Sequence, residues 1–90
     1  MIEILGNPTV LVVDDAPDAL SLINDTLEQA NINTLVALDG KQALNVAERM
    51  VPDMILLDAL MPNMDGFETC ARLKSNPRLA NIPVIFMTGL

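Results

Sequence analysis

The chain has 90 residues, of which 51% are apolar, and its 12 acidic and five basic side chains give a formal charge of −7. This length suits a single domain with a core of modest size. The negative charge repels phosphate backbones, and the two phenylalanines are the only aromatic residues, so the composition predicts no binding of nucleic acid by this segment.

The first part of the chain alternates between strand and helix patterns. A β-branched apolar run, Thr9–Val13, predicts a strand that ends at Asp14 and Asp15. A proline in the first turn followed by an acidic residue predicts that a helix begins near Pro17. Its apolar face is formed by residues at three- and four-residue spacing, namely Leu20, Ile23, Leu27 and Ala30. A shorter run flanked by polar residues, Thr34–Leu38, predicts an edge strand.

The second part continues the same alternation. Asp39 and Gly40 predict the start of a second helix, whose inward stripe is Ala43, Leu44, Ala47 and Met50. The apolar run at Met54–Asp58 is bounded by turn residues, which is typical of a strand buried on both faces. A third helix is predicted over Gly66–Ser75, with Phe67, Cys70, Ala71 and Leu73 available for packing. Val84–Met87 is predicted to be a fourth strand.

Short connections between alternating strands and helices predict a parallel sheet with right-handed crossovers. If Thr34–Leu38 lies at an edge, Thr9–Val13 is the neighbour of Met54–Asp58. Val84–Met87 is apolar at every position, as interior strands are, so we expect the natural fold to need one or two further strand–helix units of about 20 residues each. The unpaired side of this strand predicts self-association.

Three acidic residues lie at the predicted ends of two neighbouring strands. Asp14 and Asp15 follow the first strand and Asp58 ends the third, so all three are expected at the same rim of the sheet, where ligands of open parallel sheets bind. Two carboxylates 4 Å apart repel by about 4 kcal/mol near a protein surface, so such a cluster needs a cation or a raised pKa. An all-oxygen site of this kind suits Mg²⁺. The simpler interpretation is that Asp14 and Asp15 cap the following helix and that Asp58 is an ordinary strand terminator.

Two other motifs fit the sequence poorly. Asn63–Gly66 resembles the middle of an EF-hand loop, but aligning its glycine places Met61 at the first ligand position and Arg72 at the last. An Asp-x-Asp phosphatase motif is absent, because Ala16 and Leu60 occupy the positions two beyond Asp14 and Asp58. No nucleophile based on His or Ser is evident, so we predict no enzyme acting on an external metabolite.

Three motifs, Val12–Asp15, Leu57–Gly66 and Val84–Gly89, resemble those of receiver domains of bacterial two-component response regulators, the CheY-like family. The resemblance extends from about residue 9 to residue 90. It implies a flavodoxin-like, doubly wound parallel α/β sheet of strand order 2-1-3-4 that lacks the fifth strand and the last helices. Residues 1–90 are then one receiver domain, truncated at its C-terminal side, with residues 1–8 as an N-terminal lead-in.

The same resemblance implies functions for individual residues. Asp58 would accept a phosphoryl group from the phosphohistidine of a sensor histidine kinase or a phosphotransfer protein. Asp14, Asp15, Asp58 and the backbone carbonyl of Leu60 would hold Mg²⁺. The hydroxyl of Thr88 would contact the phosphoryl group. The only chemistry expected is phosphorylation and dephosphorylation of the domain itself.

The sequence departs from the family at two functional positions, a lysine at the end of the fifth strand and an aromatic residue on that strand. The only lysines here, Lys41 and Lys74, lie in predicted helices. The alternative hypothesis is therefore a receiver scaffold that is not phosphorylated and acts as a self-associating interaction module. Cys70 is the only cysteine, Met1–Leu5 lacks a basic signal-peptide region, and no apolar run spans a membrane, so the expected location is the cytoplasm.

Overall fold

A parallel four-stranded sheet forms the centre of the computed structural model, which describes residues 6–87. The strands are β1 (Thr9–Val13), β2 (Asn33–Ala37), β3 (Met54–Asp58) and β4 (Val84–Met87). Their order is β2-β1-β3-β4, which confirms the predicted flavodoxin-like arrangement and the edge position of β2. The pairing places Val13 of β1 beside Leu57 of β3, so the carboxyl ends of these two strands meet at one rim.

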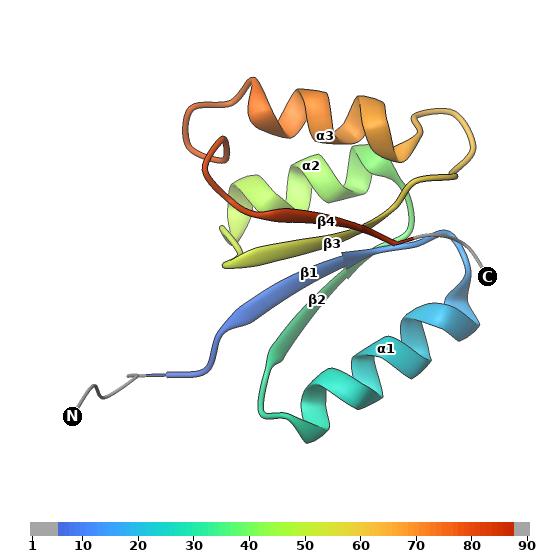
Figure 1. Ribbon diagram of the computed structural model, residues 1–90, viewed down its shortest axis with the longest axis vertical. Coiled ribbons are helices and arrows are strands. Elements are labelled where there is room, and N and C mark those ends of the chain that lie inside the picture. The colour runs from blue at the N-terminus through green and yellow to red at the C-terminus, as the bar shows by residue number, and fades with distance from the viewer. Residues whose placement is uncertain (1–5, 88–90) are drawn as a thin grey trace.

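Three helices cover the two faces of the sheet. They are α1 (Pro17–Gln29), α2 (Gly40–Arg49) and α3 (Gly66–Lys74). Helix α1 lies on one face, and α2 and α3 lie together on the other (Figure 1). Within residues 6–87, no helix combines the length and apolar character needed to cross a lipid bilayer.

Alternate residues of the central strands supply two separate cores. On β1, Leu11 and Val13 face α2 and α3, whereas Val10 and Val12 pack in the cluster that contains Leu20 of α1. This is the period-two alternation of a strand, and because helices cover both faces of the sheet, residues 10–13 of β1 are all apolar. The carboxyl end of β1 is therefore anchored by packing on both faces of the sheet.

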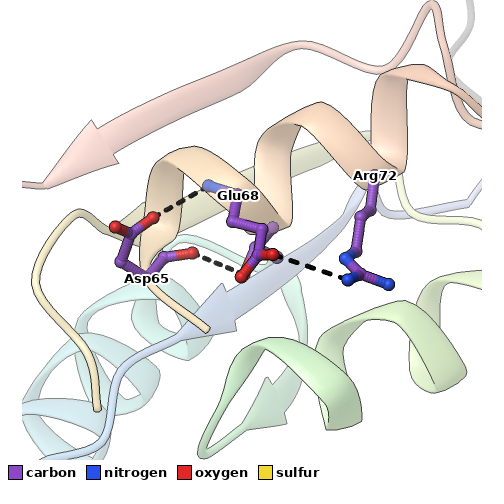
Figure 2. A network of polar contacts seen from close by, with 4 residues as sticks. Asp65, Glu68 and Arg72 are labelled. Carbon is purple, nitrogen blue, oxygen red and sulfur yellow. Dashed lines mark hydrogen bonds and ion pairs between the residues drawn. The ribbon is translucent and has the colours of Figure 1, made fainter. Parts of the chain in front are cut away.

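Two helices begin at an aspartate that caps them. The Asp39 carboxylate accepts a hydrogen bond from the Gln42 amide (2.8 Å) at the start of α2. The Asp65 carboxylate accepts from the Glu68 amide (2.8 Å) at the start of α3, where Glu68 also pairs with Arg72 at 3.5 Å (Figure 2). These bonds satisfy amides that have no partner inside the helix. Both helices therefore start at defined residues beside the carboxyl rim.

Some residues that were predicted to lie on the packed faces of the helices are exposed instead. Met50 was placed on the inward stripe of the second helix, but α2 ends at Arg49 and the Met50 side chain is 59% exposed. Ala30 is the C-cap of α1 and is exposed, and Ala71 is exposed on α3. Phe67 is 61% exposed at the first turn of α3 and contacts Phe86 of β4, with ring centroids 4.9 Å apart.

Candidate functional site

Asp58 is the last residue of β3, and its side chain is only 7% exposed. Its Oδ1 accepts a hydrogen bond from the backbone N–H of Leu60 at 3.0 Å. This is an Asx-type turn, in which a side-chain oxygen binds the amide two residues ahead. The turn fixes one carboxylate oxygen of Asp58 against the backbone.

Asp14 and Asp15 follow β1 directly and reach the same rim. Asp14 is held by two hydrogen bonds: its N–H donates to the carbonyl of Ala37 (3.1 Å), and its Oδ1 accepts from the amide of Ala16 (2.9 Å). Carboxylate oxygens of Asp14, Asp15 and Asp58 all lie within 4.8 Å of one another. The structure thus brings together the three acids that the sequence placed at neighbouring strand ends.

The electrostatics of this cluster show in the pKa of Asp14, which is raised. Burial is the largest cause, and the negative charges of Asp58 and Asp15 add to it, while the hydrogen bond from the Ala16 amide acts in the opposite direction. Partly buried carboxylates in mutual contact are stabilised by a cation that neutralises them. The three carboxylates form an oxygen-only donor set, which fits a hard divalent ion such as Mg²⁺.

The remaining residues suggested by the sequence are placed as follows. Leu60 contributes its N–H to the site through the bond to Asp58. Thr88 lies outside the described residues. Lys41 is exposed in the first turn of α2. Lys74 donates to the carbonyls of Ala80 (3.0 Å) and Ile82 (2.6 Å), and therefore fixes the loop before β4.

Sequence reasoning missed the backbone groups that orient the acids. The amides of Ala16 and Leu60 each lie two residues beyond an aspartate that they bind. This i to i+2 spacing is the signature of an Asx turn and was available in the sequence. The close approach of Gly66 to Asp58 could not be predicted from the sequence, because it depends on how α3 packs against β3.

Comparison with known proteins gives consistent matches. A family model described as "Response regulator receiver domain" matches residues 10–90. The chain is 43% identical over 81 residues to the response regulator PleD of Caulobacter vibrioides, and the match covers 90% of this chain and 18% of PleD. It is 39% identical over 83 residues to the DNA-binding dual master transcriptional regulator RpaA of a Synechocystis species, covering 92% of this chain and 34% of RpaA. The chain thus spans about a third or less of these two relatives.

Solved structures agree with the sequence matches. The N-terminal domain of a response regulator receiver protein from Methanoculleus marisnigri superposes with a TM-score of 0.86 at 37% identity, covering 88% of this chain and 64% of that one. The chemotaxis protein CheY4 of Vibrio cholerae superposes with a TM-score of 0.87 at 30% identity, covering 90% of this chain and 68% of that one.

Proposed function

The chain belongs to the response regulator receiver domain family, a family of signalling domains, and on this basis we propose that it is a phosphoacceptor switch in which Asp58 receives the phosphoryl group. The observation that carries the proposal is the convergence of Asp14, Asp15 and Asp58 within 4.8 Å at the carboxyl ends of β1 and β3. A partly buried cluster of like charges lowers the stability of the fold, and such a cost is usual where the charges serve a site. If Asp14 and Asp15 only capped the following helix, neither the convergence of the three aspartates nor the burial of Asp58 would be explained.

In the proposed reaction, a carboxylate oxygen of Asp58 attacks the phosphorus of a phosphohistidine. The P–O bond to Asp58 forms as the P–N bond breaks, and the imidazole leaves with the electron pair and takes up a proton. Leu60 holds Oδ1 of Asp58, so the attacking atom is assigned to the other oxygen, Oδ2. Proteins catalyse phosphoryl transfer almost entirely by positioning and electrostatic stabilisation, and the bond from Leu60 serves the positioning of the nucleophile.

Mg²⁺ is the proposed metal ion, with Asp14, Asp15, Asp58 and the Leu60 carbonyl as its protein ligands. When bound, it reduces the repulsion between the anionic carboxylate and the anionic phosphoryl group. Asp14 is oriented for this by the Ala16 amide, which occupies its Oδ1. Thr88 is proposed to contact the phosphoryl group through its hydroxyl.

Incubation with Mg²⁺ and acetyl phosphate tests this proposal by intact mass. We expect wild type to gain one phosphoryl group, and Asp58→Asn to gain none. Asp65→Asn is the matched control: it removes a carboxylate seven residues away, yet asparagine still caps α3, so phosphorylation should persist. Wild type that gains no mass in Mg²⁺ would refute the proposal and favour the alternative, a receiver scaffold that acts without phosphorylation.

The partner is proposed to be a sensor histidine kinase or a phosphotransfer protein, with the reaction in the cytoplasm. No binding of nucleic acid is proposed for this segment, whose net charge is −7.

Self-association through β4 is proposed as a second interaction. Among the described residues, β4 pairs with β3 on one side and with no strand on the other. Ile85 is 48% exposed and Phe86 38% exposed, so an apolar side chain is exposed on each face of this strand beside its unpaired edge. Open apolar edges pair with other chains.

Sedimentation over a range of protein concentrations tests this interaction. We expect the average mass to rise with concentration in wild type and to stay monomeric in Ile85→Lys, because a charge blocks edge pairing. Leu22→Lys is the matched control, since Leu22 is 69% exposed on α1, away from β4. Equal association of wild type and Ile85→Lys would exclude β4 as the interface.

A further inference from the structure

Gly66, the first residue of α3, lies directly against the backbone of the proposed phosphoacceptor. A β-carbon at this position would lie 2.8 Å from Cα of Ala59 and 3.0 Å from the carbonyl carbon of Asp58, and would be nearer still to the Asp58 carbonyl oxygen. All three atoms belong to the backbone, so no rotation of a side chain relieves the contact. The absence of a side chain at Gly66 therefore permits α3 to rest on the peptide that joins Asp58 to Ala59.

Hydrogen bonds hold this peptide and the one that follows it. The Ala59 N–H of the first peptide donates to the carbonyl of Met87 at 3.3 Å, and the Ala59 carbonyl of the next peptide accepts from the Gly66 N–H at 3.1 Å. The Asp58 carboxylate in turn takes the N–H of Leu60. The direction of the carboxylate is thus set by the backbone from 58 to 60, and that backbone is set by α3 as well as by β3.

Helix α3 is itself fixed where it meets this peptide. Asp65 caps it through the Glu68 amide (Figure 2), and the buried Thr69 hydroxyl donates to the Asp65 carbonyl at 2.8 Å. On the side facing α2, Gly40 lies so close to Thr69 and Met64 that a β-carbon there would meet their side chains. The first turn of α3 has little freedom to move away from Asp58.

From these contacts we propose that Gly66 is a positioning residue for Asp58, acting through the Asp58–Ala59 peptide on both metal affinity and phosphoryl transfer. The inference rests on the proposed function, which it deepens by assigning the orientation of the nucleophile to α3. A methyl group at Gly66 displaces this peptide, which moves the Asp58 carboxylate from its place beside Asp14 and Asp15. Changes to groups that orient metal ligands typically lower metal affinity about 10–100-fold.

Comparison of Gly66→Ala with Leu73→Val tests the proposal, because both disturb the packing of α3 but only the first touches the Asp58–Ala59 peptide. Leu73 is fully buried near the other end of α3, and valine removes one methylene from the core there. We expect Gly66→Ala to weaken Mg²⁺ binding, measured by calorimetry without a phosphodonor, by about 10-fold or more. Leu73→Val should stay within about twofold of wild type, although it is less resistant to urea.

Kinetics with acetyl phosphate separate positioning from general loosening. Misplacing a reacting atom by about 1 Å costs on the order of 100-fold in rate, so the maximal rate should fall in Gly66→Ala while the half-saturating acetyl phosphate concentration changes little. A folded Gly66→Ala chain with wild-type Mg²⁺ affinity and rate would overturn the inference. Loss of Mg²⁺ affinity in Leu73→Val to the same degree would also overturn it, because any loosening of α3 would then have the same effect.

If Gly66→Ala does not fold, hydrogen exchange of the backbone amides in wild type tests whether Gly66 positions Asp58. Coupling between two sites is reciprocal, so Mg²⁺ bound at Asp58 should slow exchange of the Gly66 amide. Unchanged exchange at Gly66 on saturation with Mg²⁺ would contradict the inference. If wild type binds Mg²⁺ without being phosphorylated, the proposed function fails while the Mg²⁺ comparison still decides the role of Gly66. A wild-type chain with no measurable Mg²⁺ affinity overturns both.

Discussion

Replacing the buried Asp58 by asparagine should make the metal-free chain more stable. Asparagine keeps the shape of the side chain, and its carbonyl oxygen can still accept the Leu60 N–H, but it removes a charge that lies within 4.8 Å of two other carboxylates. At that separation the repulsion between Asp58 and Asp14 is about 0.9 kcal/mol at the dielectric constant of water and about 3.5 kcal/mol at an effective value of 20. The cluster is partly buried, so we expect the free energy of unfolding to rise by about 1–2 kcal/mol.

Urea unfolding in chelator, followed by circular dichroism near pH 7, measures this change. Asp53→Asn is the matched control: Asp53 accepts the Thr9 amide at 2.7 Å at the amino end of the sheet, so removing its charge should give no gain. Addition of Mg²⁺ at 100 times its dissociation constant should stabilise wild type by about 2.7 kcal/mol and Asp58→Asn by less. A metal-free Asp58→Asn chain no more stable than wild type would refute the electrostatic account of the cluster.

Four further outcomes follow from single residues. Leu57→Ala, at a fully buried position of β3, should lower the free energy of unfolding by about 3–5 kcal/mol in urea titrations, and a loss below about 1 kcal/mol would contradict the assigned core. The pKa of Asp14 is raised in the folded chain, so the stability that its protonated form contributes is fully present below the ordinary carboxyl pKa and is lost as the pH rises through the raised value. Asp14→Asn should remove this decline of the free energy of unfolding with pH, measured by metal-free urea titrations at several pH values. Asp39→Ala removes the cap on the Gln42 amide and should cost about 1 kcal/mol, seen also as faster exchange of that amide. Asn63 has a φ of 67°, so Asn63→Ala should cost about 1–2 kcal/mol in the same assay, whereas Asn63→Gly should cost little.

The sheet could be predicted because its signals are local. The apolar runs at Thr9–Val13 and Met54–Asp58 mark strands buried on both faces, and the weaker, polar-flanked β2 marks an edge. If β2 lies at the edge, β1 and β3 are neighbours among the first three strands, whichever of them pairs with β2. The meeting of Asp14 and Asp58 then follows from parallel geometry alone.

Helix ends and the support of the site could not be predicted in the same way. Met50 continues the apolar period of α2, but its backbone (φ −134°, ψ 89°) has already left the helix, so the side chain points to solvent. The contact of Gly66 with Asp58 requires the packing of α3 on β3, which no local pattern encodes. Asp53 appeared only as a helix-stopping residue, yet its carboxylate binds the first residue of β1.

Locating the phosphoryl group within the chain is the most direct test of the central claim. Borohydride converts an aspartyl phosphate to homoserine, and cleavage after Arg49 and Arg72 releases one peptide that contains Asp53, Asp58 and Asp65. After incubation with Mg²⁺ and acetyl phosphate, we predict homoserine at position 58 alone, and none when Mg²⁺ is chelated. Homoserine at 53 or 65, or an unmodified peptide in the presence of Mg²⁺, would contradict the assignment of Asp58 as the phosphoacceptor.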